Sequence, residues 1–180
     1  MKKTDNLSGK VAYSGIITGV SVVLMVCSSF IPIGKYAFPA IAGALICLIV
    51  IEFGKIWAWS AYIAVSLVSI ILCADKQIAV YFIVFFGCYP ILKAIFERIK
   101  NKYISTVVKF TMFNASAIAV YYIFSYIFNI TLENIKIYNI NIVVVLFVVG
   151  NIAFIIYDIC LSKAINIYIN KYRKIINKYM

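Results

Sequence analysis

The feature that most constrains this chain is its first apolar run, which extends from Lys10 to Pro32 and contains no charged residue after Lys10. A helix needs about 20 apolar residues to cross the hydrocarbon core of a bilayer, which is about 30 Å thick. The run therefore predicts a membrane-spanning helix near the N-terminus. It is too long for the apolar core of a signal peptide, and no small-x-small cleavage site fits well after it, so we expect it to be retained.

The composition of the whole chain agrees with this first run. The 180 residues are 65% hydrophobic and only 13% charged, whereas a soluble domain is about 45–50% apolar. Too few polar residues are present to cover the surface of a soluble globule. We therefore predict a polytopic membrane protein of the all-α class, with a single membrane domain over residues 1–180.

Apolar runs separated by short polar connections predict a bundle of six transmembrane helices. These six runs cover about residues 11–32, 37–53, 56–74, 77–96, 104–129 and 141–161. Lys and Arg residues indicate the orientation of the bundle, because positively charged loops remain on the cytoplasmic side. With a cytoplasmic N-terminus and six spans, 14 of the 17 Lys and Arg residues lie inside, and only Lys35, Lys76 and Lys136 lie outside. Both termini are thus expected in the cytoplasm.

The basic residues also bear on the partners of the chain. They flank apolar spans, so they indicate contact with anionic membrane lipid and not with nucleic acid. At the C-terminal end, residues 162–180 form a basic amphipathic segment that we expect in the cytoplasm. Its pattern fits either a helix lying on the inner leaflet or a straight extension of the sixth span.

Residues that commonly carry catalysis or bind metals are scarce in this sequence. The chain has no histidine, no Walker sequence and no Gly-x-Ser-x-Gly elbow, and its six acidic residues are dispersed. The five cysteines stand singly inside apolar runs and form no Cys-x-x-Cys pair, which is typical of free thiols packed as small apolar side chains. We therefore expect no catalytic residues, no metal site and no cofactor.

A few polar and aromatic side chains in the outer halves of the spans are candidates for a pocket. Aromatic walls with a small number of amides are typical of sites for small organic molecules. The same residue types also serve interhelical hydrogen bonding and aromatic belts, which leaves that alternative open. The candidate substrate-binding residues are Asn114, Asn151, Tyr81, Tyr121, Tyr122 and Ser125.

Small residues follow one face of the first predicted helix. Ser8, Ala12, Gly15 and Gly19 are spaced by four, three and four residues, which places them on one side of a helix. Small residues allow another helix to approach the backbone closely. The spacing alone fits equally well packing inside the bundle and docking of a partner at Ala12, Gly15 and Gly19.

Together, the six short spans, the cytoplasmic termini and a first helix that begins Lys-Val-Ala-Tyr-Ser-Gly-Ile-Ile-Thr-Gly resemble the S components of energy-coupling factor transporters. The resemblance implies a small bacterial membrane protein that captures a vitamin, a vitamin precursor or a metal ion on the outer side. It also implies docking on a transmembrane coupling subunit that carries two ATPases, through a row like that of Ala12, Gly15 and Gly19. The histidine-rich N-terminus of the nickel and cobalt members is absent, so a small organic nutrient is the expected substrate.

A second function fits the same spans, small-residue rows and basic tail. A non-transporting membrane protein that scaffolds or regulates a larger membrane complex would need the same features. The sequence leaves both functions open.

Overall fold

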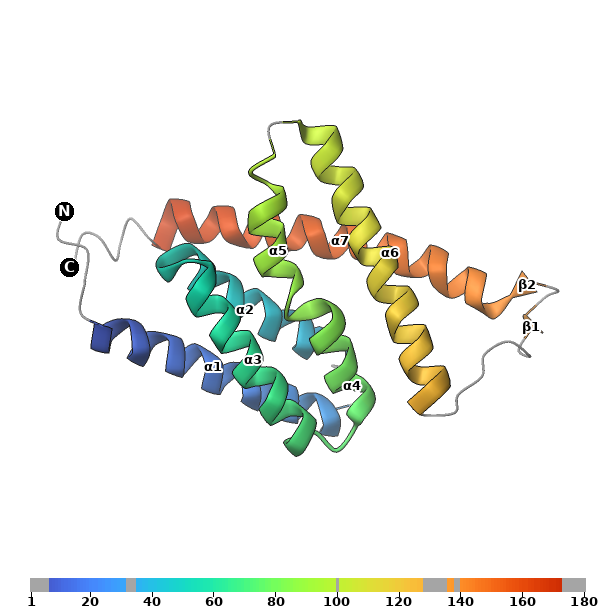
Figure 1. The fold of residues 1–180 in the computed structure, drawn as a ribbon, viewed down its shortest axis with the longest axis horizontal. Coiled ribbons are helices and arrows are strands. Elements are labelled where there is room, and N and C mark those ends of the chain that lie inside the picture. The colour runs from blue at the N-terminus through green and yellow to red at the C-terminus, as the bar shows by residue number, and fades with distance from the viewer. Residues whose placement is uncertain (1–6, 32–34, 100, 128–135, 138–139, 173–180) are drawn as a thin grey trace. The chain divides into compact units, whose positions relative to one another are not determined.

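The computed structural model describes residues 7–31, 35–99, 101–127, 136–137 and 140–172, and these residues are almost entirely helical (Figure 1). The first four helices are α1 (Leu7–Phe30), α2 (Ala37–Phe53), α3 (Lys55–Leu72) and α4 (Lys76–Tyr81). A π-helical turn, η2 (Phe82–Phe86), then leads toward α5 (Tyr89–Phe96). The remaining elements are α6 (Lys102–Ile127), the strands β1 (Lys136–Ile137) and β2 (Ile140–Asn141), α7 (Ile142–Ile167) and a second π-helical turn, η3 (Tyr168–Tyr172).

Five helical segments in the described part of the chain are long and apolar enough to cross a membrane. They are Leu7–Phe30, Lys55–Leu72, Lys76–Phe96, Lys102–Tyr126 and Val145–Asn170. The remaining predicted span, the second one at 37–53, corresponds to the shorter apolar helix α2, whose 17 residues rise about 26 Å at ~1.5 Å per residue. The predicted helical fold is confirmed and is consistent with a membrane protein, whereas six crossings and the location of the termini stay predictions.

The chain separates into two compact units, Met1–Met112 and Phe113–Met180, with the boundary inside α6. The single bundle expected from the sequence therefore stays a prediction. Of the predicted tail, residues 162–172 are helical and continue from α7 into η3, while residues 173–180 lie outside the described part.

Unit 1 contains α1 to α5 and the first part of α6, and α1 packs against both α2 and α3. Its core is apolar and fully buried at Met25, Ile46 and Val65. At one end of the unit, the ring of Tyr13 near the start of α1 lies edge-on to that of Phe53 at the end of α2, with centroids 5.4 Å apart. These helices are therefore antiparallel, as short connections require.

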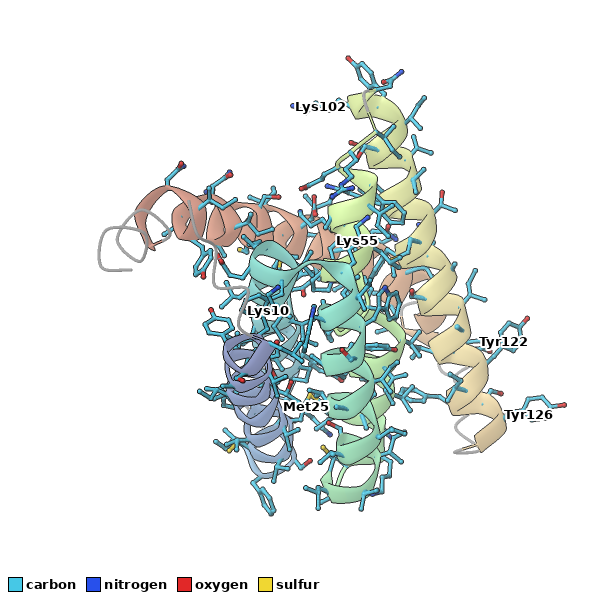
Figure 2. All side chains as sticks on the ribbon, turned by 60° about the vertical axis from the view of Figure 1, so that its left-hand side comes forward. Lys10, Met25, Lys55, Lys102, Tyr122 and Tyr126 are labelled. Carbon is cyan, nitrogen blue, oxygen red and sulfur yellow. The ribbon has the colours of Figure 1, made fainter. Side chains whose placement is uncertain are left out.

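Charged side chains in the described part of unit 1 segregate toward the two ends of its helices. The end at which α1 begins and α2 ends has the cations Lys10, Lys55, Lys93, Arg98, Lys102 and Lys109 and the anions Glu52 and Glu97. The opposite end has Lys35, Lys76 and Asp75. Figure 2 shows Lys10 and Lys55 toward one end of the unit, with Met25 farther along α1. This is the charge distribution that the predicted orientation requires.

Two positions in unit 1 require glycine, one for its backbone conformation and one for lack of space. Gly54 alone separates α2 from α3 and has a φ of +91°, a conformation that side chains disfavour. Gly87 follows η2 and has an ordinary φ of −79°, but it has no room for a side chain. A Cβ at Gly87 would lie 2.6 Å from Cδ2 of Tyr62 and 2.9 Å from Cε1 of Phe82. Hence the Tyr62 side chain on α3 packs closely against the backbone of Gly87, in the segment between α4 and α5.

Replacing Gly87 with alanine is expected to destabilise the protein by about 1–3 kcal/mol, because the buried ring of Phe82 and the partly buried ring of Tyr62 must move. Equilibrium unfolding in mixed detergent micelles measures this change. Gly9→Ala is the matched control, since no heavy atom lies within 4 Å of its would-be Cβ, and we expect it to be neutral or slightly stabilising. A Gly87→Ala variant as stable as Gly9→Ala would contradict the close contact.

Candidate functional site

Helix α1 carries small residues on two different faces. One face, which the sequence analysis did not single out, holds Ser14, Ser21 and Ser28 at a spacing of seven, and all three are buried. The hydroxyl of Ser21 lies 3.4 Å from the carbonyl oxygen of Ala42 on α2, to which it donates. This serine face is therefore the one that packs α1 into unit 1.

The second face of α1 holds Ala12, Gly15 and Gly19, and all three are exposed. At ~100° per residue, its centre lies about 150° around the helix from the serine face. Among the described residues, no heavy atom comes within 4 Å of the position that a Cβ would take at Gly15 or Gly19. Packing within unit 1 does not use this face, so its two glycines present bare helix backbone.

The two predicted asparagines meet in unit 2. The Nδ2 of Asn151 on α7 donates to Oδ1 of Asn114 on α6 at 3.2 Å, and also to the carbonyl oxygen of Phe147 at 2.8 Å. Beside this pair, the rings of Phe113 and Phe154 stack with centroids 4.7 Å apart. Helices α6 and α7 are thus in contact through an amide hydrogen bond and through aromatic stacking beside it.

Two further candidates share the Asn114 side of α6. Tyr121 and Ser125 follow Asn114 by seven and eleven residues, which places the three on one helical face. Tyr122 lies off that face: its side chain is 61% exposed, and Figure 2 shows it pointing away from the helix. Its ring lies edge-on to that of Tyr121, with centroids 5.9 Å apart.

The last candidate, Tyr81, belongs to unit 1, where its ring lies edge-on to that of Tyr36 with centroids 5.4 Å apart. Nearby along the chain, Nζ of Lys35 lies 2.6 Å from Oδ2 of Asp75 and ties the start of α2 to the start of α4. A common pocket that includes Tyr81 and the unit 2 residues stays a prediction.

The Lys35–Asp75 contact shifts both groups toward their charged forms. The hydrogen bond with Asp75 and its negative charge raise the pKa of Lys35 above the usual value. Burial acts to raise the pKa of Asp75, but the hydrogen bonds from Lys35 and from the Gln77 N–H outweigh it, so that pKa is lowered. The Asp75 carboxylate therefore serves both as an ion-pair partner and as the N-cap of α4.

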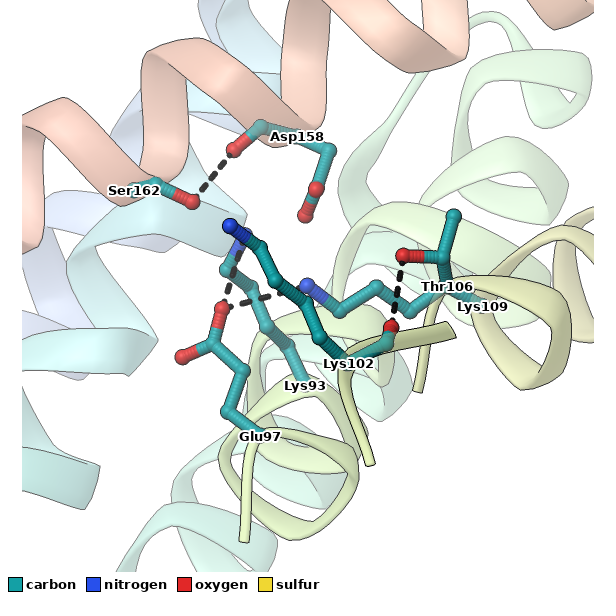
Figure 3. A network of polar contacts seen from close by, with 7 residues as sticks. All are labelled: Lys93, Glu97, Lys102, Thr106, Lys109, Asp158 and Ser162. Atoms are coloured by element: carbon teal, nitrogen blue, oxygen red, sulfur yellow. Dashed lines mark hydrogen bonds and ion pairs between the residues drawn. The ribbon is translucent and has the colours of Figure 1, made fainter. Parts of the chain in front are cut away.

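At the other end of unit 1, one carboxylate oxygen contacts two ammonium groups. Oε1 of Glu97 lies 3.4 Å from Nζ of Lys93 and 3.1 Å from Nζ of Lys109 (Figure 3). The Lys93 side chain is only 1% exposed, and its ammonium lies 6.0 Å from the centroid of the Tyr89 ring. The sequence placed Lys93 and Glu97 on one helical face, whereas the contact with Lys109 joins α5 to α6.

Within the described ranges, no three or more His, Cys, Asp or Glu side chains are grouped as metal ligands would be. Sequence reasoning also missed Tyr62, whose phenol donates to the carbonyl oxygen of Ile83 at 2.8 Å. Gly87 and Pro90, three residues apart inside an apolar run, were the available signal that the fourth span is irregular at this point.

Comparison of the chain with protein-family models, with curated proteins and with solved structures finds no match.

The Asn114–Asn151 contact is expected to couple the two residues energetically. A double-mutant cycle with Asn114→Leu and Asn151→Leu should give about 0.6 kcal/mol, and no more than about 1.7, as for other hydrogen bonds between membrane helices. Unfolding in mixed micelles measures it. A control cycle that pairs Asn151→Leu with Tyr122→Phe should be additive within ~0.5 kcal/mol. Equal coupling in the two cycles would show that the amide pair has no specific role.

Proposed function

We propose that this chain is a substrate-capture subunit of the cell membrane for a small organic nutrient such as a vitamin or its precursor. In this proposal it has six spans, both termini in the cytoplasm and no catalysis of its own. It docks through Ala12, Gly15 and Gly19 on a separate transmembrane coupling subunit, and the ATPases of that module supply the energy.

The observation that carries the proposal is that one small-residue face of α1 packs inside unit 1, whereas the other is exposed. Inside unit 1, close helix approach is provided by Ser14, Ser21 and Ser28. The row of Ala12, Gly15 and Gly19 is exposed, so its small size is not explained by packing within unit 1. Lipid does not require small side chains, and glycine weakens a helix by roughly 0.5–1 kcal/mol relative to alanine. A partner helix that approaches this backbone explains why two glycines stand here.

Capture of a nutrient is supported by the polar residues of unit 2. Asn114, Tyr121 and Ser125 share one face of α6, and Asn151 reaches Asn114 from α7. Amides and a phenol in an otherwise apolar setting can orient a small organic molecule through a few hydrogen bonds. To bind here, the ligand would have to form hydrogen bonds with the two amides in place of the one that they form with each other.

A second function, a non-transporting scaffold or regulatory subunit, is favoured by a specific observation. The amide of Asn151 donates both to Asn114 and to the carbonyl oxygen of Phe147, which is how amides hold helices together without a ligand. Equilibrium binding to the purified full chain separates the two functions. Saturable binding of one vitamin-like compound supports capture, and no binding across a broad panel of such compounds supports the scaffold.

Enlarging the glycines is expected to abolish docking while leaving the fold intact. Gly15→Leu with Gly19→Leu should reduce co-purification of a transmembrane partner and of its associated ATP-hydrolysing activity at least tenfold. The cause is that leucine side chains prevent close backbone contact. Gly15→Ala with Gly19→Ala is the matched control and should retain the complex. Unchanged complex formation and uptake in the leucine variant would contradict docking at this face.

A further inference from the structure

The predicted fourth span, Lys76–Phe96 in unit 1, is not a continuous α-helix. The N–H of Gly87 donates to the carbonyl oxygen of Phe82 at 2.7 Å, a step of five residues. The N–H groups of Ile91 and Leu92 both donate to the carbonyl oxygen of Cys88. Pro90 has no N–H, so it cannot donate to the carbonyl four residues earlier, as an α-helix would require. The backbone ladder is therefore interrupted between α4 and α5, inside a segment apolar enough to span a membrane.

Side chains satisfy carbonyl groups at this interruption. The phenol of Tyr62 on α3 donates to the carbonyl oxygen of Ile83 at 2.8 Å, and the thiol of Cys88 lies 3.2 Å from that of Val84. In hydrocarbon each backbone carbonyl needs a donor, so these contacts maintain the irregular segment. A hydrogen bond from a side chain can be released without unwinding a helix.

The two halves of the crossing are held by different parts of unit 1. Asp75, the N-cap residue of helix α4, pairs with Lys35, which lies just before α2. Glu97, the C-cap residue of helix α5, contacts Lys109 on α6. Each half thus has its own polar anchor at its own end of the unit.

We propose that Phe82–Cys88 is a hinge about which α5 moves relative to α4, and that the Tyr62 hydroxyl is the latch that holds it. Gly87 allows the movement because it offers no side chain to the Tyr62 ring packed against it. Isolated π-helical turns occur frequently at functional sites. The hinge does not depend on nutrient capture, since its geometry lies wholly within unit 1.

Hydrogen exchange of the full chain in lipid nanodiscs, followed by mass spectrometry, tests the hinge. The amides of residues 84–89 should exchange at least tenfold faster than those of residues 42–49 in the middle of α2. Tyr62→Phe removes the latch and should raise the rate at 84–89 at least fivefold. Pro90→Ala restores an N–H to the α-helical ladder and should lower the exchange rate at 84–89 at least fivefold. Tyr103→Phe, whose side chain is 85% exposed, is the control and should change neither rate.

Opposite shifts in the two variants distinguish a hinge from general destabilisation, which would raise the rate in both. If Tyr62→Phe does not fold, Cys88→Ala replaces it, with Cys27→Ala on α1 as its control. Exchange at 84–89 as slow as in α2, or shifts of the same sign in the latch and Pro90→Ala variants, would overturn the proposal.

Discussion

A helix surrounded by lipid gains little by hiding apolar side chains, because the lipid is equally apolar, so close backbone approach and hydrogen bonds must hold it to its neighbours. Unit 1 depends on this constraint. Its interior is formed where α1 presents Ser14, Ser21 and Ser28, residues small enough for α2 and α3 to come near. Because these residues already fulfil the requirement within unit 1, the exposed row of Ala12, Gly15 and Gly19 calls for a different explanation.

The same constraint governs where polar groups lie in unit 1. Ion pairs are found near the ends of its helices, at Lys35–Asp75 and around Glu97, as expected for helices in a membrane, where ionisable groups are costly near the bilayer centre. Between those ends, the polar contacts that replace the interrupted ladder are neutral, from Tyr62 and Cys88 to backbone carbonyls. Ion pairs at the two ends and neutral hydrogen-bond donors at the interruption are consistent with two rigid half-helices joined by one movable segment.

Much of the fold could be predicted from the sequence, because charge-free runs set helix length directly. The predicted span at 37–53 has the same bounds as α2, and that at 56–74 differs from α3 by at most two residues at either end. Gly87 and Pro90 indicated that this span is irregular, but the π-helical turn itself was missed, because residues 82–86 have the pattern of an ordinary apolar helix and the stabilising phenol of Tyr62 lies 21 residues before Ile83.

The candidate site was predictable only in part. Both asparagines were identified from their depth in the spans, but their mutual hydrogen bond depends on how α6 and α7 pack. The spacing of the glycine row could be read from the sequence. Its exposure could not, because the sequence does not indicate which of the two small-residue faces of α1 turns inward. Tyr122 was chosen with Tyr121 by residue type, although consecutive residues point about 100° apart on a helix.

Photo-crosslinking in native membranes tests most directly whether the glycine face of α1 contacts protein. A crosslinking amino acid at Ile16 or Val23 flanks this face, and one at Leu67 on α3 is the comparison; these side chains are 68%, 60% and 59% exposed. If the face is a docking surface, positions 16 and 23 give discrete protein adducts while position 67 gives lipid adducts. Lipid adducts alone at all three positions would show that the glycine face is an ordinary lipid-facing surface.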